Sequence, residues 1–245
     1  MLRRIGRVLY AIWSPFFALQ LGINTTILTT AALVCVLVTG HGRYSHLVGR
    51  FWSRLNVLMT GARVTLRGVE HIAAGQPYIV MANHQSQYDI FAVMGWLPMQ
   101  FAFVLKHTIR KVVLLGYTLD RLGYIYVDRS NSENTAKSLA NAAAKIRSGT
   151  SVFFFPEGTR SPDGRLIEFK SGGFRVAQAA GVPILPVTIN GTRKIWRRGS
   201  LLLSPGRIDV TVHPPIAIPV GEERAVRSQL MEQVRMAIQA DLRVD

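Results

Sequence analysis

The stretch with the most evident chemistry is NHQSQYD at residues 83–89, where a histidine and an aspartate stand five positions apart. A short apolar run at 78–82, typical of a buried strand, precedes it, and a longer one at 90–97, typical of a helix, follows. Within one helix, five residues at about 100° each would turn the two side chains well apart. Across a strand–helix turn, His84 and Asp89 can meet.

A histidine held by a carboxylate is the arrangement that a general base needs, because the carboxylate fixes the ring tautomer and stabilises the imidazolium. Ser86 and Asp89 also form the Ser-x-x-acid pattern that caps a helix N-terminus. Asp89 therefore has two candidate roles, as a capping acid and as the partner of His84. Taken alone, a histidine such as His84 is more often a structural or simply exposed side chain than a catalytic one.

Three further polar segments each follow a run that predicts a strand: Asp128-Arg129, PEGTRS at 156–161 and NGTR at 190–193. In open α/β sheets, ligands bind at the carboxyl ends of the strands. If these strands run parallel, all four polar segments lie at one edge, together with Lys106 at the end of its own strand. The sequence therefore predicts a shared crevice that holds one His–Asp pair and several cations.

Local pairing offers an explanation of some of these residues without any function. Glu157 could form an ion pair with Arg160 inside a turn, and Arg129 could pair with the preceding Asp128. Four polar segments with the same placement at strand ends are harder to explain by folding alone.

The rest of the chain alternates short β-like runs with helical ones. The strands are expected at residues 63–67, 78–82, 101–106, 123–127, 152–155, 184–189 and 208–213. The helices are expected near residues 88–97, 109–121, 133–147, 173–180 and 222–242. This alternation predicts an α/β fold with a largely parallel, seven-stranded sheet flanked by helices. The helix at 133–147 is the best marked, since Ser130-x-x-Glu133 is a capping box and Gly149 a stop signal.

The N-terminal segment is apolar and predicts a membrane anchor. Residues 8–42 contain no Lys, Arg, Asp or Glu, and Pro15, Gly22 and Asn24 interrupt the run. We expect two helices, at 8–21 and 25–39, each about 21–23 Å long and shorter than the hydrocarbon core of roughly 30 Å.

Arginines flank the apolar segment on both sides, so a single span would place positive clusters on opposite faces of a membrane. A hairpin dipping into one leaflet avoids this conflict and is the expected arrangement. A single span remains the alternative. A cleaved signal peptide is a third interpretation, but no small-x-small cleavage site ends a short apolar region. An amphipathic helix at 44–59 would connect the anchor, residues 1–60, to a catalytic domain at 61–245.

Composition limits the classes of partner. The chain has 245 residues and a net charge of +15, which favours phosphates, anionic membrane lipids or an acidic carrier protein. Nucleic acid would suit the charge as well, but no RNA-binding aromatic signature is present. The single cysteine, Cys35, lies in the apolar run and excludes both an internal disulfide and a Cys-ligated metal cluster. We expect neither a metal nor a bound cofactor.

At this point the residues carry a family resemblance. NHQSQYD matches the His-x-x-x-x-Asp block of the glycerolipid acyltransferases, and three further blocks follow in that family's order. They are LGYIYVDR at 122–129, FFPEGTRS at 154–161 and VPILPV at 182–187, with FKSGGFRVA at 169–177 similar to the segment after the third block. The resemblance covers residues 63 to 213, and its layout is most similar to membrane-bound bacterial enzymes that make phosphatidic acid from 1-acylglycerol-3-phosphate.

The resemblance implies a role for each matching residue. His84 and Asp89 would be catalytic, while the phosphate of the acceptor, lysophosphatidic acid, would be bound by Arg129, Glu157, Gly158, Thr159 and Arg160. Lys106, Ser86 and Pro183 would support the site. The donor would be an acyl thioester, either acyl-CoA or acyl-carrier protein. The expected location is the inner membrane, with the catalytic domain facing the cytoplasm.

Three functions fit the sequence. The first is acylation of lysophosphatidic acid by direct transfer, since no Gly-x-Ser-x-Gly nucleophile elbow is present and Cys35 lies in the anchor. The second is the same chemistry on another lysolipid, such as a lysophospholipid or lyso-aminolipid. The third is a non-catalytic basic module that binds membranes or nucleic acid and does not need His84.

Overall fold

The computed structural model describes residues 2–127 and 132–244 and contains eight α-helices and seven strands within them. The helices are α1 (Leu2–Thr39), α2 (Gly42–Met59), α3 (Tyr88–Trp96), α4 (Val113–Arg121), α5 (Ser132–Arg147), α6 (Gly172–Ala180), α7 (Thr192–Ile195) and α8 (Glu223–Asp241). The strands are β1 (Arg63–Arg67), β2 (Ile79–Ala82), β3 (Phe101–Lys106), β4 (Ile125–Val127), β5 (Ser151–Phe154), β6 (Ile184–Asn190) and β7 (Arg207–Val212).

The strands form one sheet in the order β1-β7-β6-β2-β5-β3-β4. All neighbouring pairs are parallel except β6 and β7, so β1 and β7 run against the other five strands. The prediction of a largely parallel, seven-stranded sheet is confirmed. Because β2, β3, β4, β5 and β6 are mutually parallel, their carboxyl ends lie at the same edge.

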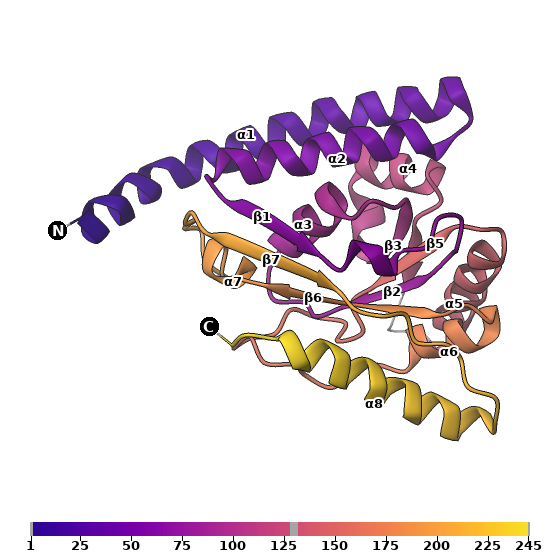
Figure 1. The fold of residues 1–245 in the computed structure, drawn as a ribbon. Helices are drawn as coiled ribbons and strands as arrows, with labels where there is room; N and C mark the ends of the chain where they lie inside the picture. Colours follow the sequence, from indigo (N-terminus) through magenta and orange to yellow (C-terminus); the bar gives the residue numbers. More distant parts are fainter. Residues whose placement is uncertain (1, 128–131, 245) are drawn as a thin grey trace.

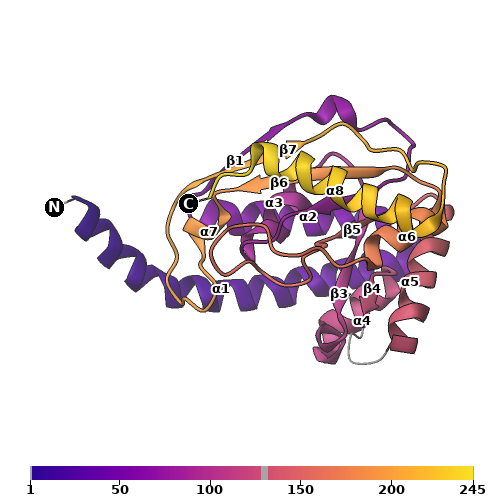
Figure 2. The same cartoon turned by 90° about the horizontal axis from the view of Figure 1, so that it is seen from below.

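Helices cover both faces of the sheet (Figures 1 and 2). The helices α1, α2, α3 and α4 lie on one face, and α5, α6 and α8 lie on the other. Successive side chains of β2 point to opposite faces, as a strand requires. Val80 and Ala82 therefore join the core beneath α2 and α3, while Ile79 and Met81 join the core beneath α5, α6 and α8.

The prediction of two apolar helices at 8–21 and 25–39 is wrong, because α1 is one continuous helix. The helix contains Pro15 and continues through Gly22 without a break. The carbonyl of Gly22 accepts a hydrogen bond from the Thr26 hydroxyl one turn later. The Asn24 amide donates to Asn56 Oδ1 on α2, so tertiary contact stabilises a helical conformation at this position. The chain reverses only at Gly40, whose φ of 68° is left-handed.

The helix pair at the N-terminus is therefore α1 with α2, the segment predicted at 44–59 as an amphipathic helix. Both helices share the core of the sheet, since Phe17 of α1 and Val57 of α2 are buried in the same cluster as Val80. A division of the chain at residue 60 stays a prediction.

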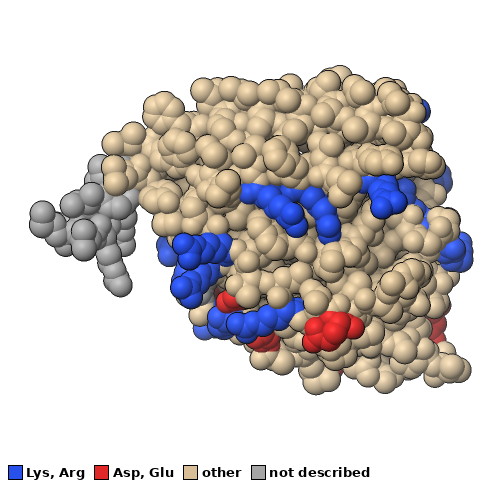
Figure 3. Space-filling view, turned by 45° about the horizontal axis from the view of Figure 1, so that its top comes forward, with Lys and Arg blue, Asp and Glu red and all other residues tan. Residues whose placement is uncertain are grey.

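The outer face of α1 is apolar and exposed. Residues Leu9–Thr39 are long and apolar enough to cross a membrane by length and composition, and only 17% of the most apolar window is buried. Figure 3 shows a broad surface without charge over α1 and α2, with Lys and Arg side chains gathered below it. Such a surface is typical of a membrane contact.

The other predicted elements are present with ends shifted by a few residues, and α7 is an addition. The predicted helix at 109–121 begins instead with a 3-10 turn at His107–Lys111, ahead of α4. The capping box at Ser130 lies outside the described residues.

Candidate active site

The turn after β2 begins with Asn83, whose side-chain amide forms the two hydrogen bonds to β6 that a backbone amide would form if the strand continued. Its amide nitrogen donates to the carbonyl of Ile189 at 2.8 Å, and its Oδ1 accepts the Ile189 N–H at 2.7 Å. These two bonds continue the pairing of β2 with β6 by one residue. The main chain of residue 84 is thereby free to leave the sheet.

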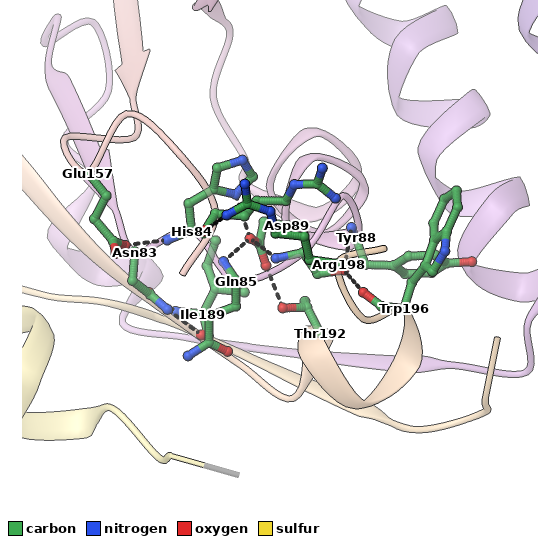
Figure 4. Close-up of polar contacts among 12 residues, drawn as sticks. Asn83, His84, Gln85, Tyr88, Asp89, Glu157, Ile189, Thr192, Trp196 and Arg198 are labelled. Carbon is green, nitrogen blue, oxygen red and sulfur yellow. Dashed lines mark hydrogen bonds and ion pairs between the residues drawn. The ribbon is translucent and has the colours of Figure 1, made fainter. Parts of the chain in front are cut away.

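His84 and Asp89 meet across the turn (Figure 4). His84 Nδ1 lies 2.7 Å from Asp89 Oδ2, and Asp89 is fully buried while the His84 side chain is 14% exposed. The same carboxylate oxygen accepts the backbone N–H groups of Gln85 at 2.7 Å and Ser86 at 2.8 Å. Asp89 thus both caps the start of α3 and holds the histidine ring, so its two candidate roles coexist.

The second oxygen of Asp89 accepts the hydroxyl of Thr192, the first residue of α7. An ionised carboxylate can only accept hydrogen bonds, so a His84 ring paired with it carries its proton on Nδ1 and leaves Nε2 as an acceptor. This is the tautomer that a general base requires. Thr192 lies within the NGTR segment, but no sequence pattern singled it out.

The PEGTRS segment is fastened to the same turn. The His84 N–H donates to Glu157 Oε1 at 2.7 Å, and the His84 carbonyl accepts the N–H of Ser161 at 2.7 Å. The ring of Phe155 stacks on the His84 ring with 4.0 Å between centroids. The aromatic residue before Pro156 was the only sequence signal for this contact.

Glu157 points into the protein. It is 2% exposed, and its other oxygen accepts the N–H of Ile167 at 3.1 Å. Burial raises the pKa of the Glu157 carboxyl to about 7, although the N–H groups of His84 and Ile167 act in the opposite direction. The structure therefore does not bring Glu157 to the cleft, and it pairs with backbone N–H groups instead of with Arg160.

Ser86 links the turn to the segment after α7. Its hydroxyl donates to the carbonyl of Trp196 at 2.7 Å and accepts the N–H of Tyr88 at 3.2 Å. The bond from the Tyr88 N–H to Ser86 and the bond from the Ser86 N–H to Asp89 together make up the predicted Ser-x-x-acid cap.

His84 faces a cleft of about 720 Å³ at the carboxyl ends of the parallel strands. The predicted residues that line this cleft with His84 are Lys106, Gly158, Thr159 and Arg160. Thus β2, β3 and β5 each contribute the segment that follows them. The prediction of a shared crevice is confirmed for these residues.

A second cavity of about 200 Å³ lies behind the cleft, between the sheet and the helices α1, α2 and α4. Its walls are almost wholly apolar. Four of its lining residues also line the cleft: Ile90, Phe103, Leu105 and Ile109. A polar cleft with an apolar extension suits an amphiphilic ligand.

Arg129 lies outside the described residues. Of the predicted residues that the structure describes, Pro183 lies away from this site. Pro183 precedes β6, at the opposite edge of the sheet from the cleft, where its carbonyl accepts the N–H of Ile79. Among residues 2–127 and 132–244, no cluster of three or more His, Cys, Asp or Glu side chains could hold a metal ion.

Comparison with known proteins gives consistent matches. The family model described as acyltransferase matches residues 63–190. The chloroplastic 1-acyl-sn-glycerol-3-phosphate acyltransferase of Arabidopsis thaliana is 31% identical over 82% of this chain and 58% of the plant protein. The 1-acyl-sn-glycerol-3-phosphate acyltransferase of Chlamydomonas reinhardtii is 30% identical over 99% of this chain and 71% of the algal protein.

The crystal structure of the 1-acyl-sn-glycerophosphate (LPA) acyltransferase from Thermotoga maritima has the same fold, with a TM-score of 0.79. The match covers 96% of this chain and 98% of that one, at 23% identity. The chain spans about three fifths of the length of the plant relatives from Arabidopsis thaliana and Brassica napus, 58% and 60%.

Proposed function

The chain belongs to the acyltransferase family, and we propose that it acylates 1-acylglycerol-3-phosphate to phosphatidic acid. The donor is a fatty acyl thioester, acyl-CoA or acyl-carrier protein. The observation that carries the proposal is the His84–Asp89 pair, which faces a cationic cleft with an apolar extension.

His84 is the proposed general base. Its Nε2 takes the proton of the acceptor hydroxyl while the hydroxyl oxygen attacks the thioester carbonyl, and Asp89 stabilises the resulting imidazolium. The imidazolium then gives the proton to the departing thiolate as the C–S bond breaks. General-base catalysis of this kind contributes roughly 10²–10⁴-fold.

The acceptor phosphate is proposed to lie against the side of the cleft formed by the PEGTRS segment. Arg160 and Lys106 supply positive charge there, and Arg forms bidentate bonds with phosphate. Gly158 has a left-handed φ of 72°, which lets the backbone approach the ligand closely. Thr159 lines the same wall, and we assign Arg129 to the acceptor on sequence grounds alone.

An acyl chain is proposed to occupy the apolar cavity behind the cleft. Ile90 and Met94 of α3 line it, whereas Phe91 and Val93 of the same helix are buried in the core. Only one face of α3 is thus available as a channel wall.

Membrane association is proposed through the exposed face of α1. This helix lies lengthwise against α2 and α4, so its apolar outer surface can rest in one leaflet while the cleft stays at the interface. Such a monotopic position lets the enzyme take an amphiphilic acceptor sideways from the membrane. The proposed location remains the inner membrane, with the cleft facing the cytoplasm.

The test is an assay of the full detergent-purified chain with lysophosphatidic acid, lysophospholipids and a lyso-aminolipid, each with both donors. His84→Ala should lower kcat by at least about 10²-fold. His41→Ala, which changes an exposed histidine in the α1–α2 turn, is the matched control and should retain activity.

Each alternative function predicts a different result. A preference for another lysolipid would replace the acceptor but keep the mechanism. Full activity in folded His84→Ala would overturn the general-base assignment, and an inactive wild type that still binds vesicles would favour the non-catalytic module.

A further inference from the structure

A turn at residues 197–202 projects two leucines into solvent. Leu201 is 87% exposed and Leu202 is 55% exposed, although the turn begins just after the half-buried Trp196 and ends just before the buried Leu203. Exposed leucines at the tip of a turn bury nothing within the chain itself. Adjoining exposed apolar side chains that form part of a larger patch are typical of a contact with a partner or a membrane.

The 197–202 turn is held firmly by its own hydrogen bonds. The Ser200 N–H donates to the carbonyl of Arg197 at 3.1 Å, and the Trp196 indole N–H donates to the carbonyl of Ser200 at 2.8 Å. The Leu202 N–H donates to the Ser200 hydroxyl oxygen at 2.9 Å. These bonds, with the bridge between Trp196 and Leu203, fix the direction in which the leucines point.

The base of the 197–202 turn is attached to α1. The Leu203 N–H donates to Ser14 Oγ at 3.0 Å, and the Trp196 ring packs edge-on against Phe17. On the same helix, side chains either side of Ser14 are exposed and apolar, among them Leu9, Ile12 and Phe16. The turn thus adjoins the apolar surface of α1.

The chemistry around the leucines is cationic. Arg197 and Arg198 are exposed and immediately precede them, and the sequence has no Asp or Glu between Glu168 and Asp209. Arg198 donates to the carbonyl of Arg160 at 3.0 Å and holds the turn against the PEGTRS segment. Apolar tips beside exposed positive charge suit the surface of an anionic membrane, where Arg197 meets headgroups and the leucines enter the acyl region. A protein partner would instead require a groove or a flat face, and the turn offers neither.

We propose that the 197–202 turn inserts Leu201 and Leu202 into an anionic lipid surface, as a second membrane contact beside α1. This goes beyond the proposed reaction, because it assigns a lipid-binding element to the catalytic domain itself. Trp196 also accepts the hydroxyl of Ser86 through its carbonyl. The contact therefore sets the position of the catalytic turn relative to the lipid surface.

The experiment measures the depth of Leu201 in vesicles. The full chain, with Cys35→Ala to remove its single cysteine, receives Leu201→Cys and a fluorescent label, and is reconstituted with lipids that carry a nitroxide on the acyl chain. The matched control is Val220→Cys with the same label. Val220 is also fully exposed and apolar, but it precedes two glutamates and α8, on the opposite face of the sheet from α1.

Quenching of the label at position 201 should be several-fold stronger than at position 220, and stronger in vesicles with anionic lipid than in purely zwitterionic ones. Equal quenching at the two positions would overturn the proposal. A signal at position 201 that depends on protein concentration in detergent and is insensitive to the lipid quencher would assign the turn to a second copy of the chain, which also overturns it. The readout is not catalytic, so either failure leaves the proposed reaction untouched.

Discussion

At the scale of single residues, Asp89 accounts for the geometry of the site. Its carboxylate accepts from His84, from two backbone N–H groups at the start of α3 and from the hydroxyl of Thr192. A buried carboxylate with this many donors is held in one orientation, and the histidine ring is held with it. The ring is also confined by its stack on Phe155.

Thr192→Val should therefore act through Asp89 as a change in positioning. The variant keeps the shape of the side chain but leaves one oxygen of the Asp89 carboxylate without its donor. We expect kcat to fall by about tenfold to hundredfold. The KM for the acceptor should change little, and Thr192→Ser should restore kcat. Thr188→Val is the control, because Thr188 is equally buried but its hydroxyl contacts the carbonyl of Ile238 in α8 and the ring of His213, away from Asp89. Equal losses in both variants would show a general packing effect.

Glu157→Gln should change the pH dependence of stability. Burial raises the pKa of this carboxyl from 4.5 to about 7 in the folded chain. The folded state therefore holds the proton more tightly than the unfolded state, which adds up to roughly 3 kcal/mol to the free energy of unfolding. This stabilisation is complete below about pH 4.5 and is lost as the pH rises through about 7. Denaturant unfolding of the wild type between pH 5 and 8 should show that decline, and Glu157→Gln should be flatter. Parallel curves for the two proteins would contradict the burial of an ionisable Glu157.

At the scale of elements, α3 is secured at both ends. Asp89 caps its start, and two arginines of α2 bond to carbonyls at its end, Arg54 to Gly95 at 2.9 Å and Arg50 to Leu97. Cations are favourable at a helix C-terminus, where carbonyls lack partners within the helix. The N-terminal helix pair thus helps to orient the helix that carries Asp89.

Arg54→Met should lower the free energy of unfolding by about 1–2 kcal/mol, because it removes the bond to Gly95 and the contact of the guanidinium with the ring of Trp96. The methionine keeps much of the apolar stem. Arg63→Met, at an exposed position at the start of β1, should change the same quantity by less than about 0.5 kcal/mol. The measurement is equilibrium denaturation in a fixed detergent. Equal effects of the two variants would argue against stabilisation of the C-terminal end of α3 by Arg54.

At the scale of the whole molecule, α1 has two different faces. Phe17 is buried in the main core against Tyr88, while Leu9, Ile12, Phe16 and Leu19 are exposed. Deletion of residues 1–40 would therefore remove both a core side chain and the lipid-facing surface. Substitutions on one face at a time separate the two roles.

Replacing Leu9, Ile12, Phe16 and Leu19 together by Gln should shift the protein from the membrane pellet to a high-salt extract, since it makes the N-terminal half of the exposed face of α1 polar and leaves the core intact. Phe17→Ala is the matched change on the buried face. It should destabilise the fold by about 3–5 kcal/mol but leave the chain in the pellet. Retention of the fourfold variant in the pellet after a salt wash would contradict this half of α1 as the main anchor.

Local sequence patterns were enough to predict the elements of the domain and the edge of the sheet where its polar segments lie. Strands and helices of an α/β fold are local patterns of apolar residues, and parallel strands bring the segments after them together, so His84, Asp89, Lys106 and Arg160 could be assigned to one crevice. The likeness of four blocks to the acyltransferases added the reaction that this crevice would serve.

Whether the N-terminal segment breaks, and which way each loop residue points, depends on packing between distant parts of the chain. Pro15, Gly22 and Asn24 are helix-breaking signals in isolation, but packing against α2 stabilises α1 as one helix, and local propensity is the weaker effect. Glu157 and Thr192 belong to segments whose position was predictable. Yet Glu157 is buried under the turn, and Thr192 bonds to Asp89 from the start of α7, 103 residues further along the chain. Such contacts depend on side-chain directions set by the packed fold, and these directions leave no periodic signal in the sequence.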